Sequence, residues 1–274
     1  MRLVSFRDPG GVERVGRLLG EQVEVLAAAS MVEWLRGEGR DGTGERLPLA
    51  EAELLAPVPE PPSVRDFFAF EGHVATGWRL RGAEIPPAWY SAPTFYFSNP
   101  ASVHGPGEEV HRPGRTRMLD FELEVAAVIG AADAIGGFTL LNDWSARDVQ
   151  REEMTIGLGP AKGKDFALSL GPWLVTPDEL PYEDGRLRIE AAASVNGVEL
   201  TRTEAGEQHF PWPDLVAHAA RDTRLRPGDV LGSGTLNRGC LLELGPLEGG
   251  RWLEPGDVVS LSAEGLGTLE TPIA

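Results

Sequence analysis

Short segments of alternating apolar and polar residues dominate the chain, and this alternation is typical of strands that bury one face. Near the start it predicts strands over 2–6, 12–19 and 22–26. A helix is predicted over 30–36, because Ser30 is a favourable N-cap ahead of an apolar-periodic run. The first part of the chain is therefore expected to be mostly β.

A proline-rich segment separates this part from the rest. Residues 56–63 contain four prolines, which favour a stiff, extended chain and are typical of a domain boundary. We therefore expect a small β domain over residues 1–60 and a larger domain over residues 61–274.

The larger part keeps the β-rich pattern and adds a few helices. Asn196-Gly197 is a strong signal for a two-residue hairpin turn, and Asp143 is expected to cap a helix. The motif Leu-x-Pro-Gly-Asp-Val occurs at 225–230 and again at 253–258, which predicts two similar turns that each lead into a strand. The expected helices cover 71–81, 144–153 and 212–220, and the expected strands cover 93–98, 120–130, 135–141, 172–175, 186–195 and 198–202.

Composition limits the partners that the chain is expected to bind. Of its 274 residues, 42% are hydrophobic, which is enough for a large core. The net charge of −17 repels phosphate backbones and anionic lipid, so we expect neither nucleic acid nor membrane as a partner. The single cysteine, Cys240, excludes an internal disulfide. Without a signal-like or membrane-spanning apolar run, the protein is expected to be soluble and cytoplasmic.

Three acids alternate with apolar residues where the chain reads Asp-Phe-Glu-Leu-Glu from residue 120. On one strand, Asp120, Glu122 and Glu124 point to the same face, and Asp143 ends the next expected strand. No basic residue is within pairing distance along this strand and no His/Cys cluster is near in the sequence. These oxygens therefore favour a hard cation, Mg²⁺, Mn²⁺ or Ca²⁺, over zinc. The alternative is the solvated face of an edge strand.

His73 is the histidine with the clearest chemical context. It follows Asp66 by seven residues, at the start of an expected helix. Imidazole is suited to act as a general base near neutral pH. Glu243 ends a glycine-rich loop and is a candidate for orienting such a base. The alternatives are a surface or satisfied core histidine and a surface glutamate.

A third group of side chains consists of hydrogen-bond donors. Arg147 and Gln150 are three residues apart and so share one face of an expected helix. Together with Lys164, they are of the kind that stabilises an oxyanion. The alternative is a surface ion pair for Arg147 and a solvated amide for Gln150.

Four segments together resemble the fumarylacetoacetate hydrolase family. They are Leu-Asp-Phe-Glu-Leu-Glu at 119–124, Asn-Asp-Trp-Ser-Ala-Arg-Asp-Val-Gln at 142–150, Gly-Lys at 163–164 and Pro-Trp-Leu-Val-Thr at 172–176. The resemblance extends in order over residues 60–274, and the second segment is long enough to be highly specific. The residues before 60 resemble the small leading domain of that family more weakly.

The resemblance implies a β-dominated α+β fold, namely a mixed β-roll or β-sandwich of the fumarylacetoacetase C-terminal type with a small N-terminal β-barrel-like domain. It also implies a Mg²⁺ or Ca²⁺ site and a homodimer. By motif position, the implied metal ligands are Glu122, Glu124, Asp143 and Asp66, the implied base is His73 oriented by Glu243, the implied oxyanion donors are Arg147, Gln150 and Lys164, and the implied substrate contacts are Tyr96 and Thr235. Phe68 departs from the family pattern, because fumarylacetoacetases have a substrate-binding tyrosine there.

The resemblance and these side chains together predict hydrolysis of a carbon–carbon bond in a β-diketo or acylpyruvate-type acid, an activity of aromatic-compound catabolism. The expected partner is then a small anionic keto acid. One alternative keeps the metal and isomerises or decarboxylates 2-hydroxyhepta-2,4-diene-1,7-dioate, or dehydrates a 2-keto-3-deoxy sugar acid. Another is a non-catalytic β module stabilised by a cation. The pair of His73 and Glu243 favours hydrolysis, because such a pair suits water activation.

Overall fold

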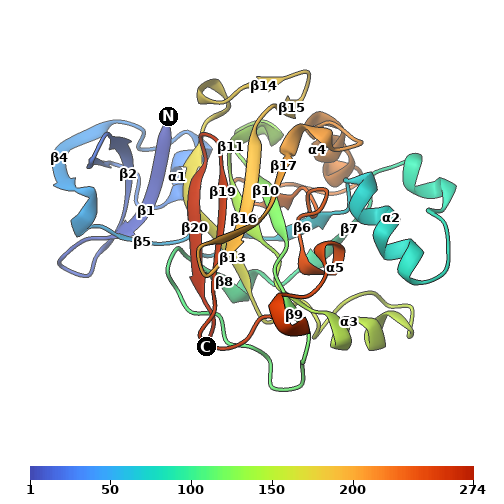
Figure 1. Ribbon diagram of the computed structural model, residues 1–274. Coiled ribbons are helices and arrows are strands. Elements are labelled where there is room, and N and C mark those ends of the chain that lie inside the picture. Colours follow the sequence, from blue (N-terminus) through green and yellow to red (C-terminus); the bar gives the residue numbers. More distant parts are fainter.

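A twelve-stranded mixed sheet organises the computed structural model, which describes residues 1–274 (Figure 1). Two further strands attach to its main path, because β5 (Glu53–Leu54) pairs with β1 and β8 (Val103–His104) pairs with β13. The main path runs, in spatial order, through β4 (Gly42–Pro48), β3 (Gln22–Leu26), β2 (Glu13–Leu19), β1 (Arg2–Arg7), β13 (Leu168–Val175), β11 (Ile135–Asn142), β10 (Leu123–Ile129), β18 (Val230–Gly232), β6 (Val64–Phe67) and β7 (Phe95–Ser98).

A four-stranded sheet covers one face of the large sheet. Its strands, in order, are β17 (Val198–Glu204), β16 (Glu190–Val195), β19 (Val258–Ala263) and β20 (Gly267–Pro272). Buried side chains of β10 and β11, such as Val125 and Phe138, belong to the same apolar cluster as Ala191 and Leu261 of the smaller sheet. The main core therefore lies between the two sheets.

Four helices gather at the end of the large sheet that β6 and β7 form, away from the N-terminal strands (Figure 1). They are α2 (Glu71–Leu80), α3 (Arg147–Met154), α4 (Trp212–Ala220) and α5 (Leu241–Leu244). The helix α1 (Met31–Arg36) lies apart from them, with the N-terminal strands. Two short ladders complete the fold, one between β9 (Leu119–Asp120) and β12 (Ser145–Ala146), and one between β14 (Tyr182–Glu183) and β15 (Arg186–Leu187). No helix has both the length and the apolar character required to cross a membrane.

The β-dominated α+β fold is confirmed, as are the N-terminal strands and the helix behind Ser30, whose side chain accepts a hydrogen bond from the Glu33 amide. The N-terminal strands do not close into a barrel. Instead, β1 pairs with β13, so that they extend the large sheet. The hairpin is also confirmed, because Asn196 and Gly197 both have positive φ (51° and 78°) between β16 and β17. Each Pro-Gly turn leads into a strand, β18 or β19.

Three local predictions are wrong, and two of the errors lie at the candidate site. Away from the site, the strand expected over 186–195 is split into β15 and β16, which belong to different sheets. The strand expected over 120–130 is split into β9 and β10, because the Glu122 amide donates to the Asn142 side chain and not to a neighbouring strand. The helix expected over 144–153 begins at Arg147, because Ser145 and Ala146 are extended and pair with β9. Asp143 therefore caps no helix.

Substitution of Phe138 provides a test of the packing in the main core. Its ring lies 5.3 Å from the ring centroids of both Tyr182 and Trp212, and it is fully buried. We predict that Phe138→Ala lowers the free energy of unfolding by about 3–5 kcal/mol, since it leaves a cavity in a close-packed core. Val198→Ala, at a side chain that is 62% exposed, is the control and should change it by less than about 0.5 kcal/mol. Urea denaturation that gives equal values for both variants would contradict this core.

Candidate active site

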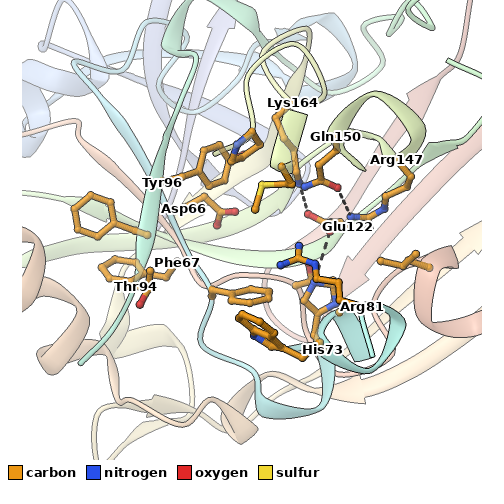
Figure 2. A pocket seen from close by; sticks show the side chains of 18 residues that line it. Asp66, Phe67, His73, Arg81, Thr94, Tyr96, Glu122, Arg147, Gln150 and Lys164 are labelled. Atoms are coloured by element: carbon orange, nitrogen blue, oxygen red, sulfur yellow. Dashed lines mark hydrogen bonds and ion pairs between the residues drawn. The ribbon is translucent and has the colours of Figure 1, made fainter. Parts of the chain in front are cut away.

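A cavity of about 330 Å³ opens at the helical end of the large sheet, between α2, α3 and the paired strands β6 and β7. Figure 2 shows side chains from all four elements pointing into it. The predicted site residues that line it are Asp66, His73, Tyr96, Glu122, Arg147, Gln150, Lys164 and Thr235. The remaining three, Glu124, Asp143 and Glu243, lie in contact with these residues, just behind the wall. The fold therefore brings together every residue that the sequence singled out.

Three buried carboxylates form the deepest part of this group. Oxygens of Asp66, Glu124 and Asp143 all lie within 4.8 Å of one another. They come from β6, β10 and the turn after β11, respectively. Asp66 has room because its partner across the ladder is Gly232, where a Cβ atom would lie 2.3 Å from Asp66 Oδ1. A glycine at this position is therefore required for the three acids to converge.

The electrostatics of this carboxylate cluster favour a cation. Burial, reinforced by the neighbouring acids, raises the pKa values of Asp66 and Glu124 well above the usual range. Burial also raises the pKa of Asp143, although Lys164 opposes the shift. Asp143 Oδ1 is buried without any hydrogen-bond partner. An all-oxygen donor set with an unsatisfied oxygen suits a hard divalent cation such as Mg²⁺, Mn²⁺ or Ca²⁺, so these residues fit a metal.

Glu122 lies beside the carboxylate cluster but is surrounded by cations. Its carboxylate forms an ion pair with Lys164, and its Oε1 lies 2.7 Å from Arg147 Nη2. Burial alone would raise the pKa of Glu122, but the charges of Arg147 and Lys164 outweigh burial and lower that pKa below its usual range. The Lys164 ammonium also lies 2.5 Å from Asp143 Oδ2. No basic partner comes from the strand itself, but Glu122 and Asp143 gain basic partners from α3 and the following loop.

His73 and Glu243 form a second group on the α2 side. His73 Nδ1 lies 2.9 Å from Glu243 Oε2, while its Nε2 faces Glu122 Oε1 at 3.8 Å. Glu243 is held by α5 and accepts a hydrogen bond from the Arg238 amide. The imidazole is therefore fixed at one nitrogen, and the other nitrogen is presented to the cavity. This is the geometry of an oriented general base.

Hydrogen-bond donors line the α3 side of the cavity. Arg147 donates through Nε to Asp120 Oδ2 at 2.8 Å and through Nη1 to Gln150 Oε1 at 3.3 Å. The amide oxygen of Gln150 accepts from Arg147, and the side chain lines the cavity, where its N–H groups can serve as donors. Figure 2 shows Gln150 and Lys164 on the same side of the cavity. Both can donate to an oxygen placed between them.

Tyr96 and Thr235 contact the carboxylate cluster as well as the cavity. The Tyr96 hydroxyl donates to Asp143 Oδ2 at 2.7 Å, and the Thr235 hydroxyl donates to Glu124 Oε1 at 3.5 Å. Burial and the charge of Asp143 raise the pKa of Tyr96 well above its usual range, which keeps the phenol protonated as a donor. In this structure, both residues therefore hold the acids in place.

Two residues that adjoin the predicted ones carry no sequence prediction. Cys240 Sγ lies 3.8 Å from His73 Nδ1 and 3.5 Å from Glu243 Oε2, so the fold forms a His/Cys group that is not evident along the sequence. The only sequence signal for it is the Cys-x-x-Glu spacing on a short helix.

Arg81 also lines the cavity. The spacing of His73, Gly77 and Arg81 at every fourth residue indicates one helix face and was available in the sequence.

Comparison with known families matches two family models to the chain. The model described as "Fumarylacetoacetate (FAA) hydrolase C-terminal" matches residues 63–274, and "Rv2993c-like, N-terminal" matches residues 1–57. Among curated proteins, the fumarylacetoacetase of Arabidopsis thaliana is 34% identical over 241 residues, which covers 65% of this chain. The chain spans 57% of the length of that relative.

Solved structures of similar proteins cover the whole chain. A 5-carboxymethyl-2-hydroxymuconate delta-isomerase from Mycobacterium smegmatis has a TM-score of 0.77 and 29% identity, and covers 100% of this chain and 99% of its own. A 2-hydroxyhepta-2,4-diene-1,7-dioate isomerase from Mycobacterium marinum has a TM-score of 0.76 and 26% identity, with 100% and 98% covered. Both the N-terminal strands and the site region are therefore shared with these proteins.

The carboxylate cluster predicts a pH-dependent response to metal. A carboxyl group with a higher pKa in the folded than in the unfolded chain binds more protons when folded, so its contribution to stability falls as the pH rises above the ordinary carboxyl range. This applies to Asp66 and Glu124 without metal.

Mg²⁺ should reverse this loss of stability, with about 2.7 kcal/mol of stabilisation at 100 times its Kd. We predict that the Mg²⁺-induced rise in Tm is larger at about pH 8 than at about pH 5, because protons compete with the metal.

Two variants control this measurement. Glu124→Gln should abolish most of the Mg²⁺-induced rise, because it removes a charged oxygen from the cluster. Glu45→Gln, at an exposed position on β4, should leave the rise unchanged. If Glu124→Gln responds to Mg²⁺ as the unaltered protein does, the cluster does not hold the ion.

Proposed function

The chain belongs to the fumarylacetoacetate hydrolase family, and on that premise we propose that it is a metal-dependent hydrolase that cleaves a carbon–carbon bond in a β-diketo or acylpyruvate-type acid. The observation that carries this proposal is the pair of His73 and Glu243, 2.9 Å apart, whose free imidazole nitrogen faces the same cavity as the carboxylate cluster. A base and a cation site on one cavity are the two components that a hydrolytic cleavage of this kind requires.

The carboxylate cluster of Asp66, Glu124 and Asp143, with Glu122 beside it, would hold the cation. When bound, a divalent cation supplies a Lewis acid that withdraws negative charge from the keto or enol oxygens of the substrate. Lys164 neutralises part of the charge of this group. In a chain of net charge −17, these local positive charges allow an anionic acid to approach.

His73 acts as the base in the proposed reaction. Its Nε2 takes a proton from water, and Glu243 holds the Nδ1–H and stabilises the imidazolium that forms. The hydroxide attacks the carbonyl carbon, and Gln150 and Lys164 donate hydrogen bonds to the oxyanion that results. The bond to the adjacent carbon then breaks, its electron pair stays on the departing carbon, and that carbon takes up the proton from His73.

The similar solved structures support a second candidate reaction. Two of them, at 29% and 26% identity, are named as a 5-carboxymethyl-2-hydroxymuconate delta-isomerase and a 2-hydroxyhepta-2,4-diene-1,7-dioate isomerase. Phe68, on the cavity wall, offers no hydroxyl to a substrate and packs its ring 5.5 Å from His73. Isomerisation or decarboxylation of 2-hydroxyhepta-2,4-diene-1,7-dioate, or dehydration of a 2-keto-3-deoxy sugar acid, would use the same cation site without a hydrolytic water.

The other parts of the proposal concern assembly and location. Ile156 and Leu158, on the loop after α3, are 80% and 92% exposed, and such apolar side chains favour a homodimer that covers them. Mg²⁺ as the resident ion, a cytoplasmic location and a place in aromatic-compound catabolism belong to the same proposal. So does the division into a leading β domain over 1–60 and a catalytic domain over 61–274.

A product assay tests the reaction directly. The protein is incubated with Mg²⁺ and, separately, with acylpyruvates, fumarylacetoacetate, a diene-dioate and a deoxy-keto sugar acid, and the products are identified by mass spectrometry. We expect two acids from an acylpyruvate or from fumarylacetoacetate. Carbon dioxide, a shifted double bond or loss of water as the main outcome would replace hydrolysis by the second candidate reaction. No turnover of any compound would reject both.

The role of His73 has its own test. We predict that His73→Gln lowers kcat by about 10²–10⁴, because the amide cannot accept the proton that water gives up. The Mg²⁺-induced rise in Tm should stay the same, since His73 is not part of the carboxylate cluster. Near-normal turnover by this variant would eliminate His73 as the base, whereas loss of the Mg²⁺ response would show that the substitution disturbs the cation site.

A further inference from the structure

Three side chains of different chemistry meet behind the cavity wall. Cys240 Sγ, His73 Nδ1 and Glu243 Oε2 are separated by 3.8 Å (sulfur to nitrogen), 3.5 Å (sulfur to oxygen) and 2.9 Å (nitrogen to oxygen). The thiol of Cys240 is fully buried, and the other two side chains are largely buried. The proposed reaction uses His73 and Glu243, but it gives the thiol no role.

These separations match those around a tetrahedral zinc ion. With zinc about 2.3 Å from sulfur and about 2.0–2.1 Å from nitrogen and oxygen, the three ligand atoms lie about 3.3–3.6 Å apart. Movements of less than roughly half an ångström would therefore bring the three atoms into place. The mixed sulfur, nitrogen and oxygen set also differs from the carboxylate cluster, because thiolate and imidazole select zinc over magnesium.

The charge balance is favourable as well. With the imidazole in the base form that the proposed reaction requires, the group carries the charge of the Glu243 carboxylate before zinc binds. A zinc-bound thiol is deprotonated, and its proton leaves to solvent. The complex of Zn²⁺ with a thiolate, a carboxylate and a neutral imidazole is then uncharged, which lowers the cost of burial.

We propose that Cys240, His73 and Glu243 form a zinc-binding site that switches the enzyme off. An imidazole that binds zinc through Nδ1 carries its proton on Nε2. The nitrogen that faces the cavity can then no longer accept a proton from water. The inhibition rests on the proposed function, because it requires His73 to be the base, whereas the binding of zinc does not.

Inhibition is measured with saturating Mg²⁺, after preincubation with increasing Zn²⁺, on the substrate that the product assay identifies. Zn²⁺ should inhibit the unaltered protein. Cys240→Ser should keep its activity but need roughly 100 times more Zn²⁺ for half-inhibition, since even the outer partners of metal ligands contribute about 10–100-fold to affinity. Equal sensitivity of the two proteins would overturn the proposal and place the inhibitory zinc at the carboxylate cluster.

Binding is measured separately with Co²⁺, which reports a thiolate ligand through a near-ultraviolet charge-transfer band. The band should appear in the unaltered protein and in Glu124→Gln, and it should be absent from Cys240→Ser or, if that variant does not fold, from Cys240→Ala. A missing band in the unaltered protein overturns the site whatever the activity. A band in a protein that turns over none of the test acids would support the site and reject the proposed function instead.

Discussion

The repulsion among three buried carboxylates is the constraint on which this structure depends. Asp66, Glu124 and Asp143 come from separate parts of the chain, and the fold holds their oxygens within 4.8 Å in a region from which water is largely excluded. Without a cation, burial favours their protonated forms, which is why their pKa values are raised. Gly232 leaves the space in which Asp66 fits. Holding three carboxylates this close lowers the stability of the fold when they are ionised, and a bound cation offsets that loss.

Glu122 links this cluster to the proposed base. It lies between the cations Lys164 and Arg147 on one side and His73 on the other, and the two cations keep it ionised. Arg147 is in turn fixed by Asp120, whose carboxylate also accepts hydrogen bonds from the first backbone amides of α5. Because α5 positions Glu243, one connected set of charges orients both the cation site and the imidazole. The two halves of the site thus share one network of ion pairs and hydrogen bonds.

Most residues of the site were predicted from the sequence, but the hydrogen bonds and ion pairs among them were not. The convergence of Asp66, Glu124 and Asp143 with His73 followed from motif positions that the resemblance supplied. The break between β9 and β10 did not follow from the alternating pattern, because the hydrogen bond from the Glu122 amide to Asn142 depends on tertiary contact. For the same reason, no local pattern could show that Lys164 reaches two of the acids.

The N-terminal strands illustrate the same limit at the level of the fold. Alternation and the Ser30 cap were enough to predict β1, β2, β3 and α1. The pairing of Arg2 with Val175, which merges these strands with the large sheet, joins segments far apart in the chain and has no local signature. Cys240 is comparable, since its approach to His73 depends on where α5 packs against α2.

Diffraction from crystals soaked with Mn²⁺, recorded for the anomalous signal of manganese, tests the central claim most directly. We expect one strong peak within bonding distance of carboxylate oxygens from Asp66, Glu124 and Asp143. The claim that these three residues bind a cation would be contradicted if a fully soaked crystal showed no peak there. The Lys164 ammonium would then be the only positive charge among them.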